Sequence, residues 1–361
     1  MNELINFIQM NNLFHKYHVD IFKNMPSSLL RPENEIKDIT SKIYKQLNSK
    51  KTYTCLFPGC SEKPIKSHSI QKSLLKNIMD STNHVLNFSL NVQFHLESDI
   101  TVNQQKIGIN DASTFEGYCN KHDTTVFLPI EQEQIDYSND EHIFLLLYRS
   151  IAREYYESRK SYFLSRDIIG EINSTLQPDD IRIPYSIIQL YLQYCEFFWV
   201  EKMKESLDSC YLLKRYNCQF KYNHITISKQ LPVFANTYFC VQGYKNGKMK
   251  QIDITKDLPY SFSITILPNN GHTDVFYAYL EEQEKDLADF LKNFQSENEI
   301  ELEEFITDTI LRNSDNFYIS PDYWNHIPDL EQKDLLKFFK ETVIDREYKI
   351  YNTLNLFKYM I

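Results

Sequence analysis

Residues 52–60 read Thr-Tyr-Thr-Cys-Leu-Phe-Pro-Gly-Cys, and this stretch decides how the first third of the chain folds. A Pro-Gly turn brings Cys55 and Cys60 together at low entropic cost. After 58 intervening residues comes a second pair, Cys119 and His122, which a helix beginning there would present one turn apart. Thiolates and imidazoles are the ligands that tetrahedral Zn²⁺ prefers. The spacing therefore predicts one structural zinc ion held by Cys55, Cys60, Cys119 and His122.

The overall composition is that of a globular protein, with 42% hydrophobic and 24% charged residues in a chain of 361. This length predicts about two domains. The seven cysteines are too sparse and too unevenly spaced for a disulfide framework. No apolar run approaches the roughly 18 residues that cross a bilayer, and the N-terminus lacks a secretory signal. We therefore predict a cytoplasmic location and no membrane contact.

Glycine is scarce, with 7 residues in the whole chain. Loops that cradle phosphates need several glycines, because the backbone must approach the phosphate without a Cβ in the way. The nearest candidate, residues 243–248, has too few residues between its glycines and lacks a following Ser or Thr. It reads instead as a hairpin turn at Asn246-Gly247. A nucleotide-driven motor and a dinucleotide-binding enzyme are thereby disfavoured.

Basic charge collects around the first cysteine pair, although the net charge of the chain is −10. Between Lys37 and Lys76 there are nine lysines against two acidic residues, which gives +7 and leaves −17 elsewhere. Such a run is commonly a solvated face, but here it coincides with the predicted zinc site. Lys63, Lys66 and Lys72 are therefore our candidate contacts to nucleic acid.

The pattern of apolar residues predicts an α+β fold in three parts: a helical arm (1–50), a zinc-binding module (51–138) and a helix-plus-antiparallel-sheet domain (139–361). The alternation of the 84–109 segment predicts a β-hairpin or a meander, and 219–280 is strand-like, with strands at 225–227, 238–241, 252–254, 262–266 and 275–279. The predicted helices are 71–79, one from Tyr118 that ends before Pro129, 142–159, 187–203, 282–294, 301–312 and 330–345.

Between the two ligand pairs lies Lys66-Ser-His68-Ser-Ile70. A cysteine knuckle, a histidine soon after it, strands, and a second ligand pair opening a helix resemble the treble-clef arrangement of HNH (His-Me finger) endonucleases over residues 52–125. The resemblance implies that His68 is the general base that activates water. It also implies that a helix residue just past the second pair, here Asp123, holds a catalytic Mg²⁺ or Mn²⁺ ion.

The chain departs from that family in its middle asparagine, since Asn110 lies far before Cys119 while Ser113 and Thr114 are nearer. His122 could also serve the catalytic ion, which would leave zinc with three cysteines. We therefore keep two functions open. The first is a nucleic-acid-binding, HNH-like endonuclease, acting on DNA more readily than RNA, whose C-terminal domain senses, specifies or binds a protein partner. The second is a non-enzymatic protein that binds nucleic acid or protein and that zinc only stabilises.

Overall fold

The computed structural model describes residues 53–91, 101–132, 135–174, 182–245, 247–344 and 353–359. The helical arm predicted for residues 1–50 lies outside these ranges. The described residues divide into two compact units: residues 157–201 and 254–256 belong to one, and residues 53–156, 202–253 and the described part of 257–361 form the other. The domain boundaries that we placed near residues 50 and 138 stay predictions.

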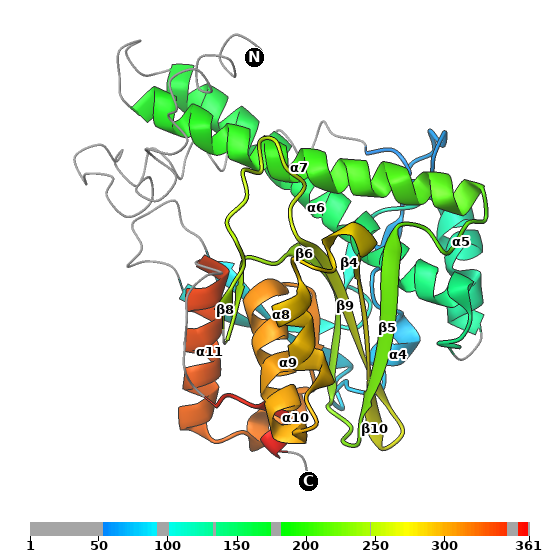
Figure 1. The fold of residues 1–361 in the computed structure, drawn as a ribbon, viewed down its shortest axis with the longest axis vertical. Coiled ribbons are helices and arrows are strands. Elements are labelled where there is room, and N and C mark those ends of the chain that lie inside the picture. The colour runs from blue at the N-terminus through cyan, green and yellow to red at the C-terminus, as the bar shows by residue number, and fades with distance from the viewer. Residues whose placement is uncertain are drawn as a thin grey trace. The chain divides into compact units, whose positions relative to one another are not determined.

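The larger unit is built on a seven-stranded sheet in the order β3-β2-β11-β6-β9-β10-β5 (Figure 1). All pairings between neighbouring strands are antiparallel. The strands are β2 His84–Asn91, β3 Thr101–Gly108, β5 Phe220–Ile227, β6 Val233–Cys240, β9 Ser261–Asn269, β10 His272–Leu280 and β11 Phe317–Ile319. The α+β prediction is therefore confirmed, and so is the 84–109 hairpin.

Helices cover one face of this sheet. Alternate residues of a strand point to the same side, so the apolar residues on that side form a surface that the helices bury. Phe262, Ile264 and Ile266 of β9 belong to one apolar core with side chains from the covering helices, whereas Leu267 belongs to a second core on the opposite face. The covering helices are α8 Ala288–Leu291, α9 Glu299–Asn313, α10 Pro321–His326 and α11 Asp329–Ile344 (Figure 1). Short 3₁₀ helices complete this part at Glu281–Gln283, Lys292–Gln295 and Leu356–Tyr359.

The segment with the predicted metal ligands forms a small antiparallel pair, β1 Lys66–His68 and β4 Thr114–Glu116, followed by helix α5, Asn120–Gln132. Between the two strands lie α4, Lys72–Leu75, and the β2–β3 hairpin of the large sheet. A two-stranded pair, β7 Gly243–Tyr244 and β8 Gly247–Lys248, lies where we predicted a hairpin turn at Asn246-Gly247, and position 246 itself is outside the described residues.

Two long helices connect the two units. α6 spans Asp140–Ser174 and α7 spans Arg182–Leu212, so both predicted stripes are helical and longer than expected. In the smaller unit, the Tyr162 ring of α6 stacks on the Phe197 ring of α7 with centroids 5.7 Å apart. The Tyr194 ring of α7 lies 5.5 Å from the same tyrosine, in a tilted arrangement. Among the described helices, none combines the length and apolar character needed to cross a membrane.

Two local predictions are wrong. Helix α5 does not stop before Pro129 but continues to Gln132, because Val126, Phe127 and Ile130 bury one face and their packing offsets the hydrogen bond that proline cannot donate. Residues 252–254 form no strand. The Asp257 amide donates to the Asp253 carbonyl there and closes a turn instead.

Candidate metal centre

The first ligand pair is held by a tight turn. The Cys60 amide donates to the Phe57 carbonyl at 3.1 Å, and Gly59 adopts a φ of +74°. Proline at the second position and a left-handed glycine at the third define a type II turn, which few residues other than glycine accept. This turn places both cysteine side chains on the same side of the loop.

The second ligand pair opens α5 and meets the first. Backbone bonds join the two segments: Leu56 N–H donates to the Gly117 carbonyl at 2.9 Å, and Ile65 N–H donates to the Tyr118 carbonyl at 2.8 Å. As a result, the ligand atoms of Cys55, Cys60, Cys119 and His122 all lie within 4.8 Å of one another. No other group of three or more such side chains is this close in the part of the chain that the structure describes.

The donor set has the size of a tetrahedral zinc site. Zinc–sulfur and zinc–nitrogen bonds of about 2.3 and about 2.1 Å require S···S separations near ~3.8 Å and S···N separations near ~3.6 Å. The structure has 4.0 Å from Cys60 Sγ to Cys119 Sγ. His122 Nδ1 lies 3.5 Å from Cys55 Sγ and 3.3 Å from Cys119 Sγ. The four residues are therefore close enough to bind a metal ion such as zinc.

The electrostatics of the thiols fit a metal that carries its own charge. Burial raises the pKa of the Cys55 thiol to about 11, whereas hydrogen bonding from the His122 amide lowers the pKa of Cys119. A bound zinc ion would stabilise all the thiolates, which neutral water and protein dipoles alone do not. The Cys119 amide also donates to Cys55 Sγ at 3.2 Å.

Buried groups around the ligands fix their orientation. The Phe57 ring stacks on the His122 imidazole with centroids 3.9 Å apart and an interplanar angle of 11°. From α7, the Lys204 ammonium, only 5% exposed, donates to the Leu56 carbonyl at 3.0 Å and pairs with Asp208. Tyr148 of α6 donates to the same carboxylate at 2.5 Å. The segment with the first ligand pair is thus bonded directly to α7 through Lys204, and α6 reaches it only through the Asp208 and Lys204 side chains.

His68, the predicted base, is the last residue of β1 and pairs with Thr114. Its ring donates to the Ile109 carbonyl, and burial lowers its pKa, so the imidazole is neutral at pH 7. Nε2 is buried without a hydrogen-bond partner among the described residues, which fits donation to Ile109 from Nδ1. A neutral imidazole in this tautomer keeps Nε2 free to accept a proton.

Asp123, the predicted ligand of a second metal, lies on the first turn of α5. Burial raises its pKa, and the Ser67 hydroxyl bonds to the carboxylate and lowers it. The Ser67 oxygen in turn accepts from the Tyr118 amide at 3.0 Å. The charges of His68 and Asp123 each influence the pKa of the other, so the two groups share one electrostatic neighbourhood.

Two further charged side chains that the sequence analysis did not single out lie in that neighbourhood. Arg149 of α6 is 4% exposed, pairs with Glu131 of α5 and lies 4.2 Å over the Phe127 ring. Its charge lowers the pKa of both His68 and Asp123. An arginine inside the apolar stretch Ile143–Ala152 was the available signal, because a charge seldom lies on a buried helix face without a partner.

The three candidate lysines all lie at the surface, Lys63 before β1, Lys66 at its start and Lys72 at the start of α4. Lys66 forms an ion pair with the exposed Asp111 carboxylate at 2.7 Å. The positive charge of Lys72 lowers the pKa of His68. Lys72 is therefore nearer to the predicted base than the sequence alone indicated.

Neither protein-family models, nor curated protein sequences, nor solved structures give a match to this chain. The metal-binding group is thus supported by its own geometry, and the HNH resemblance stays a prediction.

Proposed function

We propose that the chain is an HNH-like endonuclease that hydrolyses phosphodiester bonds in nucleic acid with His68 as general base. The observation that carries this proposal is the state of His68. Its ring donates to the Ile109 carbonyl, its pKa is lowered by burial, and its Nε2 is buried with no partner in the described residues. A general base needs this combination: a neutral imidazole in a fixed tautomer with an available nitrogen.

The other parts of the proposed site follow from their chemistry. The Cys3His group would hold a structural zinc ion that fixes the start of α5. Asp123, on that turn, would hold Mg²⁺ or Mn²⁺, which supplies a Lewis acid for the phosphate oxygens. The Ser67 hydroxyl orients the Asp123 carboxylate. His68 would accept the proton of the attacking water at Nε2.

The proposed substrate is DNA in preference to RNA, bound through Lys63, Lys66 and Lys72. These lysines are exposed on the segment that carries His68. Each phosphate contact releases counterions, so affinity should fall steeply as the salt concentration rises from about 50 to about 200 mM.

The proposal is tested by a plasmid-nicking assay with Mg²⁺ or Mn²⁺. A general base contributes about 10²–10⁴-fold, so His68→Ala should lose activity by that factor and keep its zinc. The matched control is His84→Ala, another strand histidine whose ring bonds only within its own turn, to Thr82. His84→Ala should cleave at the wild-type rate. Cleavage that persists in His68→Ala contradicts the mechanism.

Binding is tested separately by titrating labelled DNA at several salt concentrations. Lys63→Glu with Lys66→Glu should weaken binding to all sequences alike, and the control pair Lys333→Glu with Lys337→Glu, on exposed positions of α11, should not. Salt-dependent binding without any metal-dependent cleavage of DNA or RNA would favour the alternative, a zinc-stabilised protein that binds and does not cut.

A further inference from the structure

His68 stands at the open end of a very short ladder. β1 and β4 form three residue pairs, and His68↔Thr114 is the last of them. Three pairs define a strand direction but leave the terminal residue free to fray unless the following backbone is held. The residues that flank this pair, Ser69 after His68 and Ser113 before Thr114, are both almost fully buried.

Those two serines are bonded to each other. The Ser69 amide donates to the Ser113 carbonyl at 2.8 Å, and the Ser69 hydroxyl lies 3.0 Å from the same oxygen. The Ser113 hydroxyl donates to the Ile70 carbonyl at 2.9 Å. Ser113 has a φ of +59°, a left-handed conformation that a serine adopts at a cost and that the surrounding bonds must maintain.

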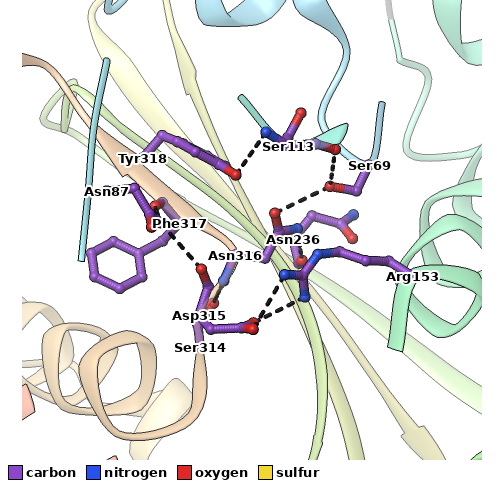
Figure 2. Close-up of polar contacts among 10 residues, drawn as sticks. All are labelled: Ser69, Asn87, Ser113, Arg153, Asn236, Ser314, Asp315, Asn316, Phe317 and Tyr318. Carbon is purple, nitrogen blue, oxygen red and sulfur yellow. Dashed lines mark hydrogen bonds and ion pairs between the residues drawn. The ribbon is translucent and has the colours of Figure 1, made fainter. Parts of the chain in front are cut away.

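The external support of both serines comes from the β11 segment, some 200 residues later in the chain (Figure 2). The Ser69 hydroxyl is 3.1 Å from Asn316 Oδ1, and the Ser113 amide donates to the Tyr318 hydroxyl at 2.7 Å. The β11 segment therefore holds both residues that flank the His68–Thr114 pair: Asn316 holds Ser69, and Tyr318 holds Ser113.

The β11 segment is itself fixed. Asn316 is fully buried, its amide group donates to the Asn236 carbonyl of β6 at 2.5 Å, and its own carbonyl accepts from Asn236 at 3.2 Å. Asn87 of β2 donates to the Asp315 and Phe317 carbonyls. Figure 2 also shows two bonds from the Arg153 guanidinium to the Asp315 carboxylate, at 2.9 and 3.2 Å.

We propose that Asn316 and Tyr318 are positioning residues for His68, which hold the end of its strand from inside the seven-stranded sheet. This inference rests on the proposed role of His68 and extends it, because it makes the C-terminal sheet part of the site's framework. The Ile109 carbonyl orients the imidazole ring, and Asn316 and Tyr318 fix the backbone that carries it. A displacement of about 1 Å of a reacting group can cost about 100-fold in rate, so loss of this support should act on the chemical step.

The test uses two conservative variants, each with a matched control in the same sheet. Tyr318→Phe removes the hydroxyl that accepts from Ser113, and Tyr238→Phe removes a similarly buried hydroxyl, bonded to Ser261, from the middle of β6. Ser69→Ala removes the hydroxyl at Asn316, and Ser263→Ala removes a buried hydroxyl bonded to Thr237 and Ser150. Zinc content is measured for all four variants. If Ser69→Ala does not fold, the inference is tested with Tyr318→Phe alone.

The first readout does not depend on activity. In nitrogen-detected NMR of the full chain, wild-type His68 should give one tautomer, protonated at Nδ1. In Tyr318→Phe and Ser69→Ala we expect a mixture of tautomers and at least tenfold faster exchange of the Ser69 amide, with both controls unchanged. An unchanged His68 signal in both test variants overturns the inference.

The second readout separates the positioning role from the proposed reaction. Where the wild-type chain cleaves, kcat of the test variants should fall about 10- to 100-fold with KM unchanged. An equal fall in the controls would show a general loss of stability and would contradict positioning. A shifted His68 signal in a chain that never cleaves supports the positioning role and rejects the endonuclease proposal, so the two failures are distinguishable.

Discussion

The metal-binding segment and the seven-stranded sheet belong to one compact unit but are stabilised in different ways. The β1–β4 ladder has three residue pairs, whereas the β10–β5 ladder has eight, and β10 pairs with β9 on its other side. Around the cysteines, a few directional contacts fix the chain: a type II turn, two backbone bonds and four ligand atoms. The sheet is instead stabilised by the packing of many buried apolar side chains from several strands and helices. We therefore expect the fold of the metal-binding segment to depend on a bound metal ion, and the fold of the sheet to depend on its large apolar core.

This contrast predicts a large and local effect when a metal ligand is removed. Cys119→Ala should reduce zinc from one equivalent to none, because apparent zinc-binding energies in such sites are on the order of 10 kcal/mol and folding depends on them. Amide exchange should accelerate in β1, β4 and the start of α5, while β9 and β10 stay protected.

Elemental analysis and hydrogen exchange check this result. Cys240→Ala, which removes a half-buried cysteine of β6 outside the ligand group, should keep zinc and protection. Full zinc stoichiometry in Cys119→Ala would show that this cysteine is not a ligand.

The sheet should respond in the opposite way, with a loss of stability and no loss of zinc. Phe262 is fully buried and contacts the rings of Phe239, Phe290 and Phe294. Phe262→Ala should lower the free energy of unfolding by about 4 kcal/mol, because it leaves a cavity in a close-packed core. Chemical denaturation measures this change.

The matched control is Leu330→Ala, since Leu330 is 72% exposed and its truncation should leave stability unchanged. Zinc loss in Phe262→Ala, at a temperature where the sheet is still folded, would contradict the proposed independence of the two regions.

Lys204 of α7 combines a buried charge with a contact to the candidate metal centre, since its ammonium donates to the carbonyl of Leu56, the residue after Cys55. Lys204→Met should cost about 3 kcal/mol, because it leaves the Asp208 carboxylate unpaired and the Leu56 carbonyl without its donor. It should also speed zinc transfer to a chelator about tenfold, the usual effect of removing an outer contact of a metal site.

Lys202→Met is the matched control, because Lys202 lies on the same helix and is 46% exposed. Equal zinc transfer rates in the two variants would show that Lys204 stabilises the fold without acting on the metal site.

The two regions also differ in how far the sequence predicted them. Ligand types and a turn are local signals, so Cys55, Cys60, Cys119 and His122 were grouped correctly from spacing alone. The β2–β3 pairing was also predictable, since both strands show the alternating apolar pattern and are close in sequence. Most helices were recognised because their apolar stripes are long.

What the sequence did not show depends on partners far along the chain. β11 has only three residues, Phe317–Ile319, yet it joins β2 to β6 and carries Tyr318 to Ser113. No local pattern marks so short a strand, because its hydrogen-bond partners lie about 80 and about 230 residues away. The central place of Asn316 was missed for the same reason, since its side chain bonds to Ser69 and to Asn236.

The smallest expected effect is at Asp80, which stands where the metal-binding segment enters the sheet. Its carboxylate accepts from the Thr82 hydroxyl at 2.7 Å, from the amides of Thr82 and His84, and from Lys106 at 3.1 Å. These donors favour the charged form and hold the pKa of Asp80 well below its ordinary value. Because the folded pKa lies below the unfolded value of about 3.9, this stabilisation is present above pH ~4 and is lost as the pH falls further.

Asp80→Asn keeps one acceptor oxygen but removes the charge, so it should cost about 1 kcal/mol at pH 7, the difference between charged and neutral hydrogen bonds. The melting temperatures of the variant and the wild type should differ by a few degrees at pH 7, and the gap should narrow as the pH is lowered towards 3, because the unfolded wild-type chain then takes up a proton at Asp80 that the folded carboxylate does not. The exposed Asp286→Asn should show no such difference at any pH. A gap between Asp80→Asn and wild type that stays constant down to pH 3 would mean that the amide disturbs the packing of the turn, and that charge is not what Asp80 contributes where the two regions meet.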